Sequence, residues 1–108
     1  MEIIFTEHFR RRYFERIEEQ QLKDKIKDAF VVPPKLAKRL KIINIPLRVI
    51  KEKKYLYAYF PAKEKGDFFC LQIRDKKIIV KTVFPIEGIA QEVMDKCLKD
   101  NKRVKEII

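Results

Sequence analysis

Residues 55–84, YLYAYFPAKEKGDFFCLQIRDKKIIVKTVF, decide the fold that we expect for this chain. Aromatic and β-branched side chains favour strands, and this stretch holds three runs rich in them: residues 55–60, 68–74 and 78–84. A polar segment and a tight turn, DKK at residues 75–77, separate the runs. Strands that follow one another through short connections pair antiparallel. The stretch therefore predicts an antiparallel meander.

The segment before this stretch extends the same pattern. Apolar side chains recur at every second position, at Ile43, Ile45, Leu47 and Val49. A period of two indicates a further strand over residues 42–50. Proline has no backbone N–H to donate, so Pro46 places this strand at an edge or a bulge of the sheet. The basic residues 35–41 are expected to form one helical turn or a loop.

The N-terminal region predicts a strand followed by helical structure. Residues 2–5 are expected to form the strand, and Thr6 can cap the helix that follows. Apolar side chains then recur at helical spacing, at Phe9, Tyr13, Ile17, Leu22, Ile26 and Phe30. This stripe fits one helix, or two with a break near Gln20 and Gln21. Pro33 and Pro34 are expected to end it.

The C-terminal region predicts one more helix. Pro85 is expected to stop the last strand, and the helix is marked by Ile86, Ile89 or Ala90, Val93 and Cys97. The predicted fold class is α+β: an N-terminal strand and helix or helices, an antiparallel four- to five-stranded sheet with helices on one face, and a C-terminal helix. A length of 108 residues fits a single domain over residues 1–108.

The chain is strongly basic, with 26 Lys and Arg against 16 Asp and Glu and a formal net charge of +10. Residues 35–54 hold eight basic residues and one acidic residue, Glu52. A field of this sign attracts phosphate backbones. A solvated surface rich in charge, as in heat-adapted proteins, is the alternative. The candidate nucleic-acid-binding residues are Arg11, Lys35, Lys38, Arg39, Lys41, Arg48 and Lys81.

The two cysteines, Cys70 and Cys97, lie far apart in apolar surroundings, and the chain has one histidine. Zinc sites need Cys and His clusters at short spacing, so we expect no metal site and no cofactor. Buried free thiols in a reducing cytosol are the preferred interpretation. The opening residues, MEIIF, lack the features of a signal peptide, and no run reaches the roughly 20 apolar residues of a membrane span. A cytoplasmic location is expected.

His8, Arg12 and Arg16 are spaced four residues apart and line one edge of the predicted helix. Arginine can bind a phosphate bidentately and stabilise charge on its oxygens. Histidine can exchange a proton with a ribose hydroxyl near neutral pH. This edge is therefore a candidate site for phosphoryl chemistry, beside a second pair formed by Arg11 and Glu15. Phosphate binding without catalysis and a merely solvated helix face are the alternatives.

Two more candidate features lie on predicted strands. Tyr55, Tyr57 and Tyr59 share one face, either as a platform on which unpaired bases stack or, as we prefer, as part of the core with hydroxyls at its edge. Lys81 and Thr82 lie in the last strand, in the segment KTVFP. The sequence contains no glycine-rich phosphate loop, no carboxylates at metal-binding spacing and no Ser–His–Asp pattern.

The string FTEHFRRRYFERI at residues 5–17, taken with KIIVKTVFP at residues 77–85, resembles small toxin-type proteins of the RelE/ParE superfamily, within the broader barnase–EndoU–colicin–RelE grouping. Such proteins open with a strand and a capped helix of the form S/T-x-H-x-x-x-R-x-x-E-R, which is matched by Thr6, His8, Arg12, Glu15 and Arg16. Their sheet closes with a T-V-Y-P-like strand, matched by TVFP from Thr82 onward. The glycine that follows E-R in the family is absent here.

The resemblance implies a RelE-like fold and metal-independent cleavage of RNA, in which the RNA's own 2′-hydroxyl attacks phosphorus. It also implies an acidic antitoxin protein as a partner. The implied catalytic residues are His8, Arg12, Glu15, Arg16 and Thr82. Two other functions remain open: a non-catalytic nucleic-acid-binding module, and a basic adaptor that binds an acidic protein.

Overall fold

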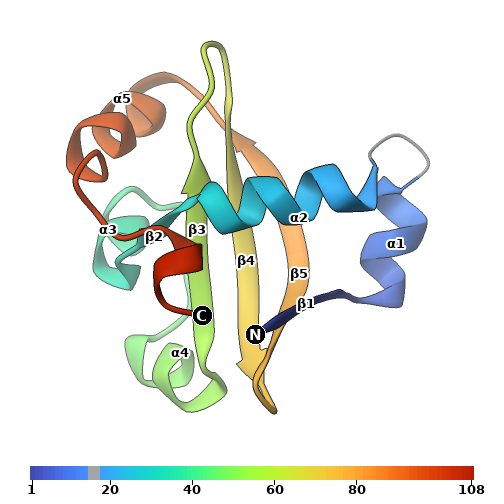
Figure 1. Cartoon of the computed structure of the whole chain (residues 1–108). Coiled ribbons are helices and arrows are strands. Elements are labelled where there is room, and N and C mark those ends of the chain that lie inside the picture. Colours follow the sequence, from blue (N-terminus) through green and yellow to red (C-terminus); the bar gives the residue numbers. More distant parts are fainter. Residues whose placement is uncertain (15–17) are drawn as a thin grey trace.

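The computed structural model describes residues 1–14 and 18–108, in which helices pack on both sides of a sheet (Figure 1). The described elements are, in chain order, β1 (Glu2–Phe5), α1 (Glu7–Tyr13), α2 (Glu19–Asp28), β2 (Phe30–Val32), α3 (Pro34–Arg39), α4 (Leu47–Lys53), β3 (Tyr55–Phe60), β4 (Gly66–Arg74), β5 (Lys77–Ile86), α5 (Gly88–Cys97) and the 3-10 turn η1 (Val104–Glu106). The predicted α+β class is confirmed.

In the described part of the chain the strands form one sheet in the order β1-β5-β4-β3-β2. The predicted meander is confirmed, since β3, β4 and β5 pair antiparallel. The β4–β5 turn places Asp75 and Lys76 at φ 50° and 59°, which suits a tight hairpin. The edge strand β2 pairs antiparallel with β3, whereas β1 pairs parallel with β5. The sheet is therefore mixed, and not antiparallel throughout as predicted.

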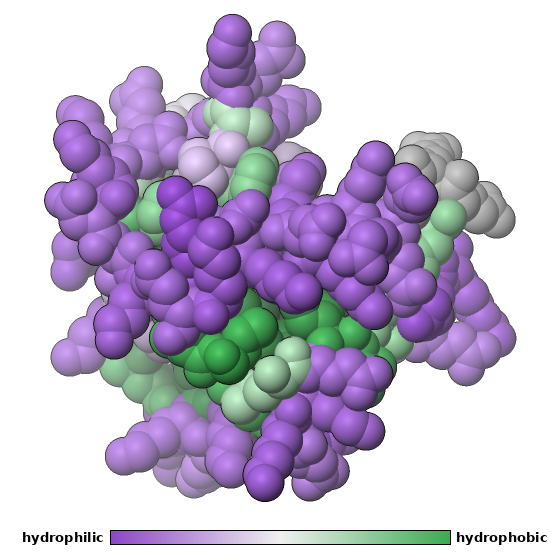
Figure 2. Space-filling view, viewed as in Figure 1, coloured by the Kyte–Doolittle hydropathy of each residue, from purple (hydrophilic) through white to green (hydrophobic). Residues whose placement is uncertain are grey.

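Both faces of the sheet are covered by helices, so the prediction of helices on one face is wrong. Phe68 and Phe69 point to opposite faces, and both are fully buried. One face packs against α1, α2 and η1, and the other against α3, α4 and α5. In Figure 2 the outer surface of α2 is hydrophilic, and hydrophobic residues are visible below the helix. Because neighbouring residues of the central strands are both apolar, the sheet requires a helical layer on each side.

Residues 42–50 do not form the predicted strand. Residues 42–46 form a connecting segment, and helix α4 begins at Leu47. Pro46 has φ −58° at the position before the helix, where its missing N–H costs little because the first helical turn has no acceptor for it. The isoleucines of the connecting segment pack against the core beneath α3 and α4. The alternation of apolar side chains in this segment therefore reflects a loop that is partly buried against the core.

The helical stripe predicted in the first third of the chain reaches too far along the sequence. The two-helix alternative is confirmed, but α2 begins at Glu19, so the boundary between the helices lies before Gln20 and Gln21, which are inside α2. The helix ends at Asp28, and Phe30 starts strand β2, which pairs with residues 57–59 of β3. Pro33 and Pro34 do not end α2. They begin α3, since proline is compatible with a first helical turn.

Two predictions near the C-terminus also need correction. Pro85 does not stop β5, which continues to Ile86. Pro85 pairs with Asp67 of β4 but lies beyond the β5 residues that pair with β1, so the other side of the strand is an edge of the sheet there, where proline is tolerated. The buried residues of α5 are Gln91 and Met94, whereas Ile89 is 78% exposed. The predicted stripe is correct for Ala90 and Val93, which are half-buried against the core. It is wrong for Ile86, which belongs to the strand, and for Ile89 and Cys97, which are exposed. Within the described residues, no helix has the length and apolar character needed to cross a membrane.

Candidate nucleic-acid interface

Helix α1 carries three of the predicted functional residues on its exposed surface. The Thr6 hydroxyl accepts a hydrogen bond from the Phe9 backbone N–H at 3.1 Å, as predicted for a cap. Phe9 is fully buried and packs against Phe5, with ring centroids 5.3 Å apart. The apolar side of α1 is therefore fixed in the core, and the side chains exposed to solvent include His8, Arg11 and Arg12.

Two hydrogen bonds attach α1 to β5. The Thr6 backbone N–H donates to the Val80 carbonyl at 3.5 Å, and the Tyr13 hydroxyl donates to the Val83 carbonyl at 3.1 Å. His8 and Arg12 lie between the two donors in sequence, and Lys81 and Thr82 lie between the two acceptors. Figure 1 shows α1 alongside β5. The two sequence motifs quoted above, about 70 residues apart, therefore meet in the fold.

Strand β5 contains a bulge at the point where α1 lies beside it. Leu71 of β4 pairs with Val80, and the preceding Cys70 pairs with Thr82, so Lys81 has no residue opposite it. A bulge of this kind redirects side chains and bends the strand. Its consequence here is that Lys81 and Thr82 both line the same pocket.

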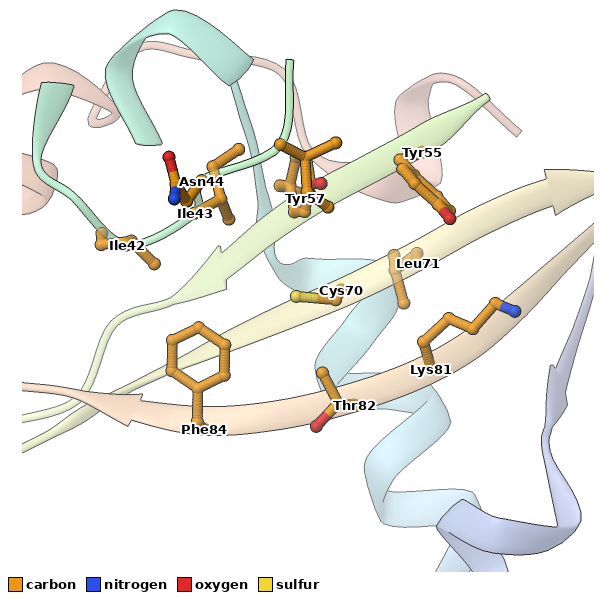
Figure 3. A pocket seen from close by; sticks show the side chains of 11 residues that line it. Ile42, Ile43, Asn44, Tyr55, Tyr57, Cys70, Leu71, Lys81, Thr82 and Phe84 are labelled. Carbon is orange, nitrogen blue, oxygen red and sulfur yellow. The ribbon is translucent and has the colours of Figure 1, made fainter. Parts of the chain in front are cut away.

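This pocket has a volume of about 390 Å³ and lies on the face of the sheet opposite α1. Its floor crosses three strands through the paired residues Tyr57, Cys70 and Thr82. The connecting segment 42–45 lies across from this floor, and the Phe84 ring forms part of the wall (Figure 3). The pocket therefore combines apolar walls with hydroxyl, thiol and ammonium groups.

Burial raises the pKa of two groups in the pocket. Desolvation raises the pKa of Cys70 to about 11. Desolvation, together with smaller effects of Cys70 and Tyr55, raises the pKa of Tyr57 to about 12. Both groups therefore stay protonated at neutral pH, and Cys70 is a poor nucleophile.

The tyrosines of β3 are mainly core residues, as preferred above. Tyr57 and Tyr59 are 3% and 1% exposed. The Tyr59 hydroxyl donates to Asp95 Oδ1 at 2.8 Å, which anchors α5 to the sheet. Tyr55 is half-buried and lines the pocket together with Tyr57. The tyrosine face therefore packs against the helices, and only part of it reaches the pocket.

A second hollow adjoins this pocket. It has a volume of about 400 Å³ and is lined by Lys38, Lys41, Ile43 and Asn44. Ile43 and Asn44 line both spaces. Two of the predicted nucleic-acid-binding lysines thus lie on one side of the pocket, and Lys81 lies on β5 at the other side. The fold brings together basic residues that are 40 or more positions apart.

The other predicted site residues have different places. Arg11 forms an exposed ion pair with Glu7 at 2.8 Å, a contact that contributes little to stability. Lys35 and Arg39 are exposed on α3 and Arg48 on α4, and none of them lines either hollow. The predictions for Glu15 and Arg16 lie outside the described residues.

Sequence reasoning missed the connecting segment 42–45 as a pocket wall, because its alternating isoleucines indicated a strand. It also missed Cys70 as a pocket residue. The expectation that both thiols are buried is wrong for Cys97, which is exposed on α5, while Cys70 is half-buried. Partial burial of Cys70 could have been inferred from its place in a strand with apolar residues on both faces.

Among residues 1–14 and 18–108, no group of three His, Cys, Asp or Glu side chains is placed to hold a metal ion. No family model matches the sequence, and comparisons with characterised proteins and with solved structures found no match. The resemblance to RelE-like proteins therefore stays a prediction.

Proposed function

We propose that this protein acts on RNA as a RelE-like toxin-type protein and cleaves it without a metal ion, at the edge formed by α1 and the β5 bulge. The observation that carries this proposal is the pair of hydrogen bonds from Thr6 and Tyr13 to β5. They hold the helix that bears His8 and Arg12 beside the strand segment that bears Lys81 and Thr82.

The charge of the chain supports an anionic substrate. The net charge of +10 favours encounter with phosphate backbones. The Arg12 guanidinium lies 5.8 Å from the centroid of the Tyr13 ring, so its side chain extends along the end of α1 that contacts β5. In the proposed complex Arg12 binds the phosphate on which negative charge develops during cleavage, and Lys81, which lines the pocket on the other face of the sheet, binds the backbone elsewhere along the RNA strand.

His8 has the chemistry for proton transfer in this reaction. The RNA 2′-oxygen forms a bond to phosphorus while the bond from phosphorus to the 5′-oxygen breaks, leaving a 2′,3′-cyclic phosphate and a 5′-hydroxyl end. His8 takes the proton from the 2′-hydroxyl or gives one to the leaving 5′-oxygen, and water takes part in the other transfer. Because His8 is exposed on α1, a phosphate bound by Arg12 is accessible to it.

Purified protein incubated with total RNA in EDTA tests the proposal, with His8→Ala as the diagnostic variant. We expect discrete cleavage by the wild-type protein and none by His8→Ala. Lys96→Ala, an exposed change on α5, serves as the control and should cleave like wild type. Thermal denaturation of each variant separates loss of activity from loss of fold. A fully active His8→Ala protein would rule out the catalytic role of His8.

A non-catalytic nucleic-acid-binding module is the second candidate. It is favoured by the pocket itself, which has aromatic walls and hydroxyl groups and whose approaches carry lysines. In this case RNA stays intact with both proteins, and the mobility shift of the complex weakens steeply as salt is raised.

A further inference from the structure

We infer that the pocket beneath segment 42–45 holds the base of one unpaired nucleotide of an RNA strand, with the neighbouring phosphates bound by Lys81 on one side and by Lys38 and Lys41 on the other. The inference rests on the proposed function in taking RNA as the ligand. It adds a base-binding subsite that cleavage at the α1 edge does not require.

The walls of the pocket suit a flat aromatic ring. Tyr55, Tyr57 and Phe84 contribute aromatic surface from β3 and β5, and the isoleucines of segment 42–45 cover the other side (Figure 3). Proteins commonly bind unpaired bases by stacking them on aromatic side chains. The volume of about 390 Å³ lies at the small end of the range of small-ligand sites. It fits one nucleotide rather than a longer stacked segment.

The polar lining suits the edge of a base. Thr82 and Tyr57 contribute hydroxyl groups, and Asn44 contributes an amide, which can both donate and accept hydrogen bonds. The Tyr57 hydroxyl, like any tyrosine hydroxyl at neutral pH, can donate a hydrogen bond as well as accept one. The pocket lining described here includes no carboxylate that would repel a phosphate near the base.

The two approaches to the pocket are cationic. The hollow lined by Lys38 and Lys41 shares Ile43 and Asn44 with the pocket. On the other side the bulge leaves Lys81 exposed at the pocket rim. Beyond Lys81 lies α1 with Arg12. An RNA strand that crosses the pocket would therefore contact a basic residue on each side of the bound base.

This arrangement requires single-stranded RNA, because a base in a duplex is stacked and paired and cannot enter the pocket. Binding of a fluorescent eight-nucleotide unstructured RNA and of a duplex of the same sequence should be measured by anisotropy. Cys70→Met is the diagnostic variant, because Cys70 is on the pocket floor and a longer side chain there fills the pocket without changing charge. Cys97→Met is the matched control, since Cys97 is exposed on α5.

We expect Cys70→Met to weaken binding of the single strand about tenfold or more, the effect of losing one stacked base. Its duplex binding and the salt dependence of binding should match those of wild type, and Cys97→Met should bind both ligands normally. Equal single-strand binding by a folded Cys70→Met protein would overturn the inference.

An NMR titration of the wild-type protein with the same RNA guards against a Cys70→Met protein that does not fold. The inference predicts that the amide signals of Tyr57, Cys70 and Thr82 shift. Shifts confined to α1 and the lysines would overturn it. Cleavage in EDTA is measured separately, so that the two proposals can fail independently. Pocket-dependent binding without cleavage would contradict the proposed ribonuclease activity alone. A Cys70→Met protein that cleaves RNA with the rate and affinity of wild type would contradict the base subsite alone.

Discussion

The two sides of β5 are built in opposite ways. On one side α1 presents exposed His8 and Arg12, and its position is set by a cap, a buried phenylalanine and two hydrogen bonds to the strand. On the other side the bulge places Lys81 and Thr82 in a largely apolar pocket, where burial raises the pKa values of Cys70 and Tyr57. Charged groups that stay in water can bind phosphate and move protons. Groups withdrawn from water offer stacking and hydrogen bonds.

In our proposal the two sides of β5 therefore have separate functions: the α1 edge cleaves RNA, and the pocket recognises a base. A change on one side should therefore leave the function of the other side intact. The following experiments test that division.

Replacing His8 should have the largest effect, and only on the α1 side. We expect His8→Ala to slow RNA cleavage by about 100- to 10,000-fold, the usual contribution of a general acid or base. Binding of single-stranded RNA by this variant should stay near that of wild type, because His8 does not line the pocket. Cleavage rates at saturating RNA, measured alongside anisotropy, check both points. A parallel loss of binding would contradict the division.

Cys70 should react about 100-fold more slowly than an ordinary exposed thiol on account of protonation. Burial raises the pKa of Cys70 from 9.0 to about 11, so its thiolate fraction at pH 8 is about 100 times lower than that of an ordinary thiol. Iodoacetamide labelling followed by mass spectrometry should modify the exposed Cys97 first. The raised pKa also predicts that the free energy of unfolding falls as the pH rises from 9 to 11, since the unfolded state releases its proton first. Cys70 labelled as fast as Cys97 would show that the pocket is open to water.

Gly66→Ala should destabilise the face of the sheet that carries the pocket, at a position outside the pocket lining. A methyl group at this position would overlap the ring of Tyr59, which is buried and bonded to Asp95. We expect a loss of about 1–3 kcal/mol in the free energy of unfolding, as for other overpacked cores. Gly88→Ala is the control: it meets no neighbouring atom, and its φ of 68° should cost about 1 kcal/mol. Denaturant titrations in which Gly88→Ala proves the less stable of the two would contradict this ranking.

Tyr13→Phe should have the smallest effect and loosen only the α1 side. It removes the hydrogen bond to the Val83 carbonyl, which should cost about 1 kcal/mol of stability. Cleavage should slow as α1 loses its fixed position beside β5, whereas single-strand binding in the pocket should not change. Denaturant titration, cleavage and anisotropy of this one variant are sufficient. Unchanged cleavage would show that the Tyr13 contact does not position His8.

Local patterns were reliable where one interaction dominates. The meander of β3, β4 and β5 followed from strand-forming runs separated by turns, and the start of α1 followed from the Thr6 cap. Local patterns failed where two different local structures, such as a strand and a loop, would bury the same side chains. The isoleucines of segment 42–45 alternate as in a strand but cover the core as a loop, and Phe30 fits a helical stripe but belongs to β2.

The sequence by itself determined the α+β class, the basic character and the exposed edge of α1, because composition, capping and alternation act over a few neighbouring residues. Only the tertiary structure decided that the TEHFRRRY and KTVFP segments meet, that Lys81 is the extra residue of a bulge, and that a pocket forms between β5 and segment 42–45. These features depend on strand register and on contacts between residues about 40 to 70 positions apart. No local pattern specifies such contacts, since many registers satisfy the same alternation of apolar side chains.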